Sequence, residues 1–301
     1  MSRWSFLLPT RYFAISAVLL VVAGAGAGYA YWEGAHPQVT VLSIDGAPEG
    51  IVFIADPHVK PGNIEKVRKV IQTINELNPS IVLIGGDFLF GEEDNLSCQE
   101  IWSEIDAPVY AVLGNHDYHA GIDATSAIAK SIAVSRTDRD LLTYDMSGLF
   151  DETTNLASAA ALEEALEAHG VMVQRNEYVM REVSGTPLLL VGVDDGWAGM
   201  ADPPAVPATD AFSIYMIHEP ECRADWDADL ILSGHTHGGQ FGGTALQFIN
   251  DAGIMELSGY VRDSRVPVYI TRGIGTSNLP WDLRIGATPE IVIINPASPV
   301  Q

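Results

Sequence analysis

Hydrophobic positions along the chain form one long run and then a series of short ones. No residue between Phe13 and Trp32 carries a charge, and a helix of that length can span a bilayer. The short apolar runs that follow alternate with segments of helical period, which predicts an α/β fold. The predicted strands are Val39–Ile44, Ile51–Ala55, Ile81–Ile84, Val109–Leu113, Leu188–Val193, Phe212–Ile217, Leu230–Leu232, Val268–Thr271 and Ile291–Ile294.

Two segments have the period of an amphipathic helix. Apolar residues recur every three or four positions from Ile64 to Leu77, where Asn63 is a candidate N-cap and Pro79 stops the helix. Leu162 and Leu166, flanked by alanines, predict a second helix.

The first apolar run predicts a membrane segment. Arg3 and Arg11 precede it and no Lys or Arg follows until Lys60, so the positive-inside rule places the amino end in the cytoplasm and residues 33–301 outside. Alanines within the run also offer sites of signal-peptide type. Because the run continues past them, its length favours a retained anchor over a cleaved signal.

The chain therefore divides into an anchor and one domain. Residues 1–36 are predicted to form a cytoplasmic amino terminus and membrane anchor or uncleaved signal, and residues 37–301 a single domain. Residues 118–155 have no dominant period. We interpret them as an insertion or lid, or equally as a plain solvated loop.

Composition excludes several classes of protein. Lys and Arg number 16 against 39 Asp and Glu, a net charge of −23, and such an acidic chain lacks the basic clusters that bind nucleic acid. Two cysteines, Cys98 and Cys222, exclude a disulfide-rich scaffold and a four-cysteine zinc module.

Five of the predicted strands end in residues that can bind metal ions. The carboxyl ends of parallel strands meet at one edge of a sheet, so these segments are expected to share one cleft. They are Asp56-Pro57-His58, Gly85-Gly86-Asp87, Gly114-Asn115-His116-Asp117, His218-Glu219-Pro220 and Gly234-His235-Thr236-His237-Gly238-Gly239-Gln240.

The donor types indicate which metal such a cleft would hold. Carboxylate, amide and imidazole without thiolate suit Mn, Fe or Zn better than Ca. The donors are too numerous for one ion and suit two ions sharing a bridging carboxylate. Each motif alone has a plainer interpretation, because Asp-x-His is common in surface loops and a lone His218 is more often structural. The ordered set of five carries the prediction.

This set resembles the calcineurin-like metallophosphoesterase superfamily, whose hallmark is D-x-H, G-D, G-N-H-D, a separate H and G-H-x-H. Segments 191–195, 218–220, 271–277 and 289–291 further resemble the subgroup typified by the bacterial YkuE and YaeI phosphodiesterases, which commonly carries an amino-terminal membrane segment. The resemblance covers about residues 39–297. It implies a four-layer α/β/β/α sandwich, with helices outside two mixed sheets.

The resemblance also implies a role for each motif residue. One metal ion would be held by Asp56, His58, Asp87 and His237, and the second by Asp87, Asn115, His218 and His235. His116 would stabilise the transferring phosphoryl group or protonate the leaving oxygen, with Asp117 orienting its ring.

The implied activity is hydrolysis of a phosphodiester or pyrophosphate by metal-activated hydroxide at the membrane surface, with two divalent ions, Mn favoured over Fe or Zn. Two dications would make the cleft locally positive although the molecule is acidic. Because long-range steering of anions would be poor, we expect a substrate delivered within the membrane plane, such as a lipid-linked one.

Three other interpretations stay open to different degrees. A lipid A precursor hydrolase of the UDP-2,3-diacylglucosamine pyrophosphatase type fits the motifs but works on the cytoplasmic side. The metallo-β-lactamase class requires H-x-H-x-D-H, whereas His235-Thr236-His237 continues into Gly-Gly-Gln. A non-catalytic metal-binding scaffold of the envelope would have no need of His116.

Overall fold

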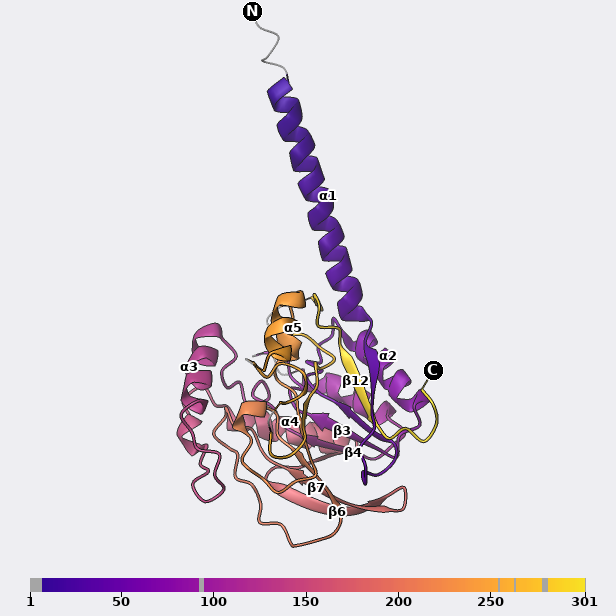
Figure 1. Cartoon of the computed structure of the whole chain (residues 1–301), viewed down its shortest axis with the longest axis vertical. Coiled ribbons are helices and arrows are strands. Elements are labelled where there is room, and N and C mark those ends of the chain that lie inside the picture. Colours follow the sequence, from indigo (N-terminus) through magenta and orange to yellow (C-terminus); the bar gives the residue numbers. More distant parts are fainter. Residues whose placement is uncertain (1–6, 92–94, 254, 263, 278–280, 301) are drawn as a thin grey trace, which may run out of the picture.

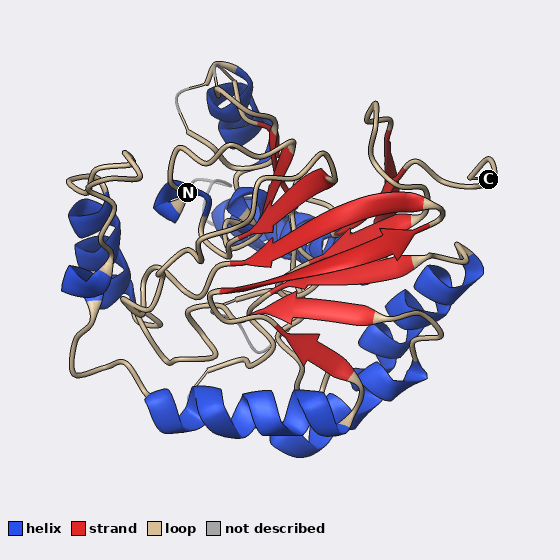
Figure 2. Ribbon diagram, turned by 90° about the horizontal axis from the view of Figure 1, so that it is seen from below, coloured by secondary structure: helices blue, strands red, loops and turns tan. Residues whose placement is uncertain are grey.

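The computed structural model describes residues 7–91, 95–253, 255–262, 264–277 and 281–300. Helix α1 (Leu7–Ala35) projects away from a body that contains all other elements (Figure 1). The body is a mixed α/β fold built on two six-stranded sheets (Figure 2), as expected from the sequence.

The first sheet contains β1 (Gln38–Leu42), β2 (Ile51–Ile54), β3 (Ile81–Gly85), β4 (Val109–Val112), β5 (Val171–Val173) and β12 (Glu290–Ile294). The second contains β6 (Glu177–Val183), β7 (Thr186–Gly192), β8 (Phe212–Met216), β9 (Leu230–Ser233), β10 (Gly259–Tyr260) and β11 (Val268–Ile270). The helices of the body are α2 (Ile64–Glu76), α3 (Ala124–Val134), α4 (Leu156–Ala168) and α5 (Gly243–Asp251), with 3₁₀ turns η1 (Leu96–Glu104), η2 (Ser147–Leu149), η3 (Pro220–Cys222) and η4 (His237–Gly239).

Most neighbouring strands in both sheets run parallel. The strand orders are β1-β12-β2-β3-β4-β5 and β10-β11-β9-β8-β7-β6. The antiparallel pairs are β12 with β2, β10 with β11 and β6 with β7. Strands β2, β3 and β4 are therefore parallel neighbours, as are β8 and β9, and all five deliver their carboxyl ends to one edge of the molecule.

Three apolar layers hold the sheets and helices together. Inner residues such as Phe53 and Leu83 of the first sheet pack against Ile214 and Leu232 of the second. The outer face of the first sheet is covered by α2, α4 and η1. The outer face of the second is covered by the end of α3, η2 and loop residues including Trp226, so this fourth layer has more loop than the expected helices.

The strand register determines where, along the strand direction, each functional segment begins. In the first sheet Ile54 is paired with Ile84, and Ile84 with Ala111. In the second sheet Met216 is paired with Leu232. The segments that follow these strands consequently begin at neighbouring levels, which the separate apolar runs in the sequence could not establish.

All nine predicted strands are present, and three further ones were not predicted. Strand β6 lies at a sheet edge and most of its side chains are exposed, so it lacks an apolar signature. β5 and β10 are only three and two residues long. Helix α3 lies within residues 118–155, where no helix was predicted; Asp123 caps it by accepting hydrogen bonds from two backbone amides.

The predicted N-cap of α2 is wrong in detail. Helix α2 begins after Asn63, but the Asn63 side chain does not cap it. Its amide oxygen accepts a hydrogen bond from the Lys60 amide and its NH₂ donates to the His58 carbonyl oxygen. Asn63 therefore steadies the loop that carries His58.

Helix α1 is joined to the body by its last turn. Residues Tyr12–Ala35 are long and apolar enough to cross a membrane, and only 6% of the most apolar window is buried. At the carboxyl end of α1, which we call its foot, Ala30 and Glu33 are buried. The Glu33 carboxylate accepts hydrogen bonds from the Gly286 amide (3.1 Å) and the Thr288 hydroxyl (3.0 Å).

We expect the contact of Gly34 with the body to be too tight for a side chain. A Cβ at Gly34 would lie 2.0 Å from the Asp282 carbonyl oxygen, whereas Gly28 has nothing within 4 Å. Gly34→Ala is expected to lower the free energy of unfolding by about 1–3 kcal/mol, measured by denaturation of the full chain in detergent. Gly28→Ala, the matched control, is expected to be neutral or stabilising; equal effects of the two changes would refute the tight junction.

Candidate metal centre

The carboxyl ends of three strands converge on a buried cluster of four residues. Asp56 and His58 follow β2, Asp87 follows β3 and His237 lies in η4 after β9. One ligand atom from each of these four residues lies within 4.8 Å of all the others, and all four side chains are buried. The expectation that these distant segments share one cleft is met for this set.

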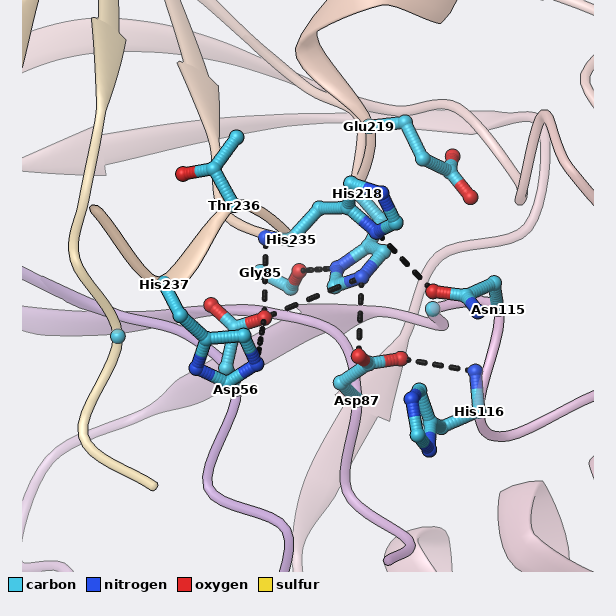
Figure 3. Close-up of polar contacts among 12 residues, drawn as sticks. Asp56, Gly85, Asp87, Asn115, His116, His218, Glu219, His235, Thr236 and His237 are labelled. Carbon is cyan, nitrogen blue, oxygen red and sulfur yellow. Dashed lines mark hydrogen bonds and ion pairs between the residues drawn. The ribbon is translucent and has the colours of Figure 1, made fainter. Parts of the chain in front are cut away.

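The other expected ligands adjoin this cluster (Figure 3). His218 Nε2 lies 3.2 Å from Asp87 Oδ2 and 4.0 Å from Asp56 Oδ1. His235 Nδ1 lies 3.1 Å from Asn115 Oδ1. Asp87 stands between the two groups, because its Oδ2 is also 3.5 Å from His58 Nε2. The chain thus presents carboxylate, amide and imidazole donors on both sides of Asp87.

The backbone at these positions is strained. Five of the cluster residues have positive φ: Asp56 (53°), His58 (43°), Asp87 (60°), His235 (70°) and His237 (50°). L-residues other than Asn and Asp rarely adopt this conformation, and such strain gathers at functional sites. Left-handed turns past the strand ends, and not the alternation of a strand, therefore aim these side chains into one space.

Backbone carbonyls fix the orientation of two imidazoles. His58 Nδ1 lies 2.7 Å from the Leu89 carbonyl oxygen and His218 Nδ1 lies 2.6 Å from the Gly85 carbonyl oxygen. A carbonyl oxygen only accepts, so each Nδ1 carries the proton and each Nε2 is turned toward the carboxylates. This is the outer arrangement that orients histidine ligands at metal sites.

Glycines allow the backbone to approach the carboxylates. A Cβ at Gly114 would lie 2.4 Å from Asp87 Oδ1, and a Cβ at Gly273, where φ is 65°, would lie 2.6 Å from Asp56 Oδ2. The carboxylates are held by amides of other segments: Asp56 Oδ1 accepts from His235 N and Asp87 Oδ1 from His116 N, each at 2.9 Å.

Burial and neighbouring charges shift the titration of these groups. Burial, helped by the negative charge of Asp87, raises the pKa of Asp56 to about 7. Burial acts in the same direction on Asp87, but the imidazoles of His218, His116 and His58 hold its pKa well below the usual range. Burial lowers the pKa of His58 to about 3 and that of His235 to about 4, so these rings are neutral at pH 7 and able to bind a cation.

The residues fit a divalent metal ion. Asp56 Oδ2 is buried without a hydrogen-bond partner, and the Nε2 atoms of His58 and His218 lie 3.5 Å and 3.2 Å from Asp87 Oδ2. Buried polar atoms are normally satisfied. A cation would satisfy these atoms together, and the mixture of nitrogen and carboxylate oxygen suits Mn, Fe or Zn.

The two expected catalytic residues lie at the edge of the cluster, and one expected role is wrong. The His116 ring packs edge-on against His58 with centroids 4.6 Å apart, and its Nδ1 has no hydrogen-bond partner. Asp117 does not orient this ring. Its carboxylate accepts hydrogen bonds from the amides of Asp87, Leu89 and Gly114 at 2.8–3.0 Å, so Asp117 fastens the loops after β3 and β4 to each other.

A cavity of about 250 Å³ opens onto the cluster. Its lining includes Asp87, His116, His235 and His237, together with the start of α3 and Trp197. The Trp197 ring lies edge-on to His235 with centroids 4.5 Å apart. Trp197 had no motif to mark it, since its place depends on the fold.

Arg284 also supports the cluster and was not predicted. Its guanidinium is fully buried; Nη1 donates to the His237 carbonyl oxygen at 3.0 Å, Nη2 lies 3.2 Å from His237 Nδ1, and further bonds reach the carbonyl oxygens of Arg272, Gly275 and Ala287. The Arg284 amide donates to the Ala30 carbonyl oxygen of α1 at 3.0 Å. One residue thereby connects α1 to the turn that carries His237.

Comparison with known proteins identifies relatives of the whole chain. The family model described as calcineurin-like phosphoesterase matches residues 50–239, which include every expected site residue. Phosphodiesterase YaeI of Escherichia coli (strain K12) is 24% identical, over 96% of this chain and 99% of that protein. The metallophosphoesterase YkuE of Bacillus subtilis (strain 168) is 28% identical over 97% and 96%. The UDP-2,3-diacylglucosamine pyrophosphatase LpxG of Chlamydia trachomatis is 26% identical over 81% and 82%.

We expect metal removal to destabilise the chain. Manganese at about 100 times its dissociation constant contributes about 2.7 kcal/mol per site to the stability of the native state. Adding manganese to the full chain, after a chelator has removed its metal, should therefore raise the Tm by about 5–10 °C. Calcium, the control ion, prefers an all-oxygen site and is expected to give a smaller shift. Scanning calorimetry in detergent checks this; a Tm indifferent to Mn, Fe and Zn would contradict a metal centre.

Proposed function

Because the chain belongs to the calcineurin-like phosphoesterase family, we propose that this phosphoesterase hydrolyses a phosphodiester or a pyrophosphate with two divalent ions. Asp56, His58, Asp87 and His237 hold the first ion, and Asp87, Asn115, His218 and His235 hold the second. The observation that carries the proposal is the position of Asp87, whose Oδ2 lies 3.5 Å from His58 Nε2 and 3.2 Å from His218 Nε2.

The ions, when bound, supply a water molecule of lowered pKa and positive charge against the phosphate oxygens. The residues of the chain do the rest. Asp87 serves both sites, so its loss affects both at once. The amides of His235 and His116, which donate to Asp56 and Asp87, hold the carboxylates in place before substrate arrives, as preorganised catalysis requires.

His116 is proposed to act on the substrate and not on a metal ion. Its backbone is tied to Asp87 and its ring lines the cavity. Its Nδ1 makes no hydrogen bond to the described residues, and we propose that the ring acts on a phosphoryl oxygen or on the leaving oxygen. Helix α3, whose first turn lines the same cavity, supports the interpretation of residues 118–155 as a lid.

The site is proposed to work at a membrane surface. Helix α1 has the length and composition of a span, and its last turn is hydrogen-bonded to the body. The chain carries a net charge of −23, which opposes capture of a polyanion from solution. A lipid-linked phosphoester, confined to the membrane beside the site, would not depend on such capture.

The body is proposed to lie outside the cytoplasm, since Arg3 and Arg11 precede the apolar run and the next basic residue is Lys60. A carboxyl-terminal phosphatase reporter that needs an oxidising compartment would then be active, and a reporter active only in the cytoplasm would refute this orientation.

The relationship to LpxG favours one alternative substrate. LpxG is named for hydrolysis of a UDP-linked lipid, and a pyrophosphate bond of that kind fits the proposed chemistry. That substrate would require the opposite orientation of the body, because the lipid A precursor is made on the cytoplasmic side.

A substrate screen tests the proposed activity. We expect the manganese-loaded full chain in detergent to hydrolyse phosphodiesters or nucleotide-linked lipids better than phosphomonoesters. Asp87→Asn is expected to lower kcat/KM by more than about 100-fold together with the metal content, since even residues behind a ligand contribute about 10–100-fold. Asp45→Asn, the same change at an exposed position, serves as the control. Metal-independent turnover, or full activity of Asp87→Asn, would overturn the two-metal proposal.

His116→Ala separates chemistry from metal binding. We expect the bound metal, measured by elemental mass spectrometry, to stay unchanged while kcat falls about 10²–10⁴-fold, the usual contribution of a positioned acid or base. His169→Ala, on the far end of α4, is the control histidine. An unchanged kcat would remove His116 from the mechanism, and a loss of metal would make it a ligand.

A further inference from the structure

The surface around the foot of α1 is apolar although the protein is strongly acidic. Four large side chains are exposed there: Phe241 (46%), Phe248 (71%), Trp281 (65%) and Ile285 (42%). We refer to these four as the foot patch. A soluble surface rarely gathers large apolar side chains without a partner.

Hydrogen bonds place the foot patch beside α1. The amide of Ile285 donates to the Gln240 carbonyl oxygen at 2.9 Å, and its carbonyl oxygen accepts from Gly243 at 3.0 Å; this joins the segment that follows Trp281 to the start of α5. The next residues of the same segment hold the last turn of α1 through Glu33. Figure 1 shows α5 at the end of the body where α1 enters it.

Charged groups are few on this surface. No residue from Gly238 to Asn250 or from Gly273 to Trp281 carries a charge, in a chain where 18% of residues are charged; the exposed Asp251 is the last residue of α5. Asp282 follows, but its carboxylate is turned inward, 3.2 Å from Lys66 Nζ. Arg284 is fully buried. A carboxylate here would lose water and meet anionic headgroups, so an uncharged surface is what a bilayer interface requires.

The aromatic residues at the end of α1 mark the level of that interface. Tyr29, Tyr31 and Trp32 are each more than half exposed, and such rings gather at the headgroup level of a spanning helix. The foot patch adjoins the same turns of α1. The segment that carries Trp281 is bonded to that end of α1, because the Arg284 amide donates to the Ala30 carbonyl oxygen.

We propose that the foot patch rests in the headgroup region of the bilayer that α1 spans, so that the body lies against the membrane in one fixed orientation. This deepens, and rests on, the proposed function: η4, which carries His237, ends two residues before Phe241. The metal centre is therefore held next to the membrane, and the phosphate of a membrane-embedded lipid reaches it without the lipid leaving the bilayer.

Depth-dependent quenching tests the contact without relying on activity. In the full chain carrying Cys98→Ser, with Cys222 buried, a single cysteine at Phe248→Cys is labelled with an environment-sensitive fluorophore in phosphatidylcholine–phosphatidylglycerol vesicles. The matched control is Met180→Cys, 40% exposed on β6 at the opposite end of the body (Figure 1). Lipids with a nitroxide near the headgroup are expected to quench position 248 at least about threefold more than position 180.

Equal quenching at the two positions would overturn the proposal. Low quenching of position 248 in dilute vesicles, with the fluorophore shielded from water only at high protein density, would also overturn it, because it would assign the foot patch to a protein contact. Since this readout requires no turnover, an inactive but lipid-quenched chain would refute the proposed function and leave the membrane contact supported.

Activity measurements test the consequence for substrate. Phe248→Ser with Trp281→Ser is expected to lower kcat/KM about tenfold for a vesicle-embedded nucleotide-linked lipid and to leave that for a soluble phosphodiester unchanged. Tyr178→Ser with Met180→Ser on β6 is the control pair. An equal loss on both substrates, or no loss on either, would show that the foot patch does not serve delivery from the membrane.

Discussion

The structure depends on keeping two carboxylates, Asp56 and Asp87, side by side and out of water. An ionised carboxylate without compensation is very unfavourable in a protein interior, and two neighbouring ones repel each other. Three kinds of group stabilise the ionised carboxylates: the surrounding imidazoles, backbone amide donors from other segments, and the buried guanidinium of Arg284, whose charge favours ionisation of Asp56. The remaining unsatisfied atoms, Asp56 Oδ2 among them, make a bound dication the natural completion of the site.

This requirement explains the architecture around the site. Parallel strands bring several carboxyl ends to one edge, and left-handed turns at Asp56, Asp87 and His235 swing the side chains off the strand direction and into a common space. Such turns are unfavourable for L-residues and persist because the sheets hold the strands beneath them; in the loops after β3 and β4, the hydrogen bonds of Asp117 add to this support. Strain and charge burial at the site are thus supported by the apolar layers that hold the two sheets and their helices together.

The sequence predicts much of this arrangement and leaves out what depends on tertiary contact. Buried strands such as Ile81–Gly85 have continuous apolar runs, and glycines with Asp, Asn and His at their ends point to the site. The exposed edge strand β6 has no such pattern, and α3 is too mixed in character to be found. The family resemblance implies that Asp117 orients the His116 ring, and the sequence pattern predicts that Asn63 caps a helix, whereas each side chain hydrogen-bonds to backbone groups brought close by folding. Arg284 and Trp197 could not be found, because nothing local marks a residue that acts across the chain.

The site is also linked to α1, which is long and apolar enough to cross a membrane. The Arg284 amide is hydrogen-bonded to α1 and the Arg284 side chain to the turn of His237, so α1 and the proposed metal centre share one supporting residue. The central claim, that distant strand ends assemble a two-ion centre bridged by Asp87, is tested most directly by anomalous X-ray diffraction from crystals of the manganese-loaded protein. The account predicts two anomalous peaks, one among Asp56, His58, Asp87 and His237 and the other among Asp87, Asn115, His218 and His235. Peaks elsewhere, or none from a protein shown to be saturated with manganese, would contradict it.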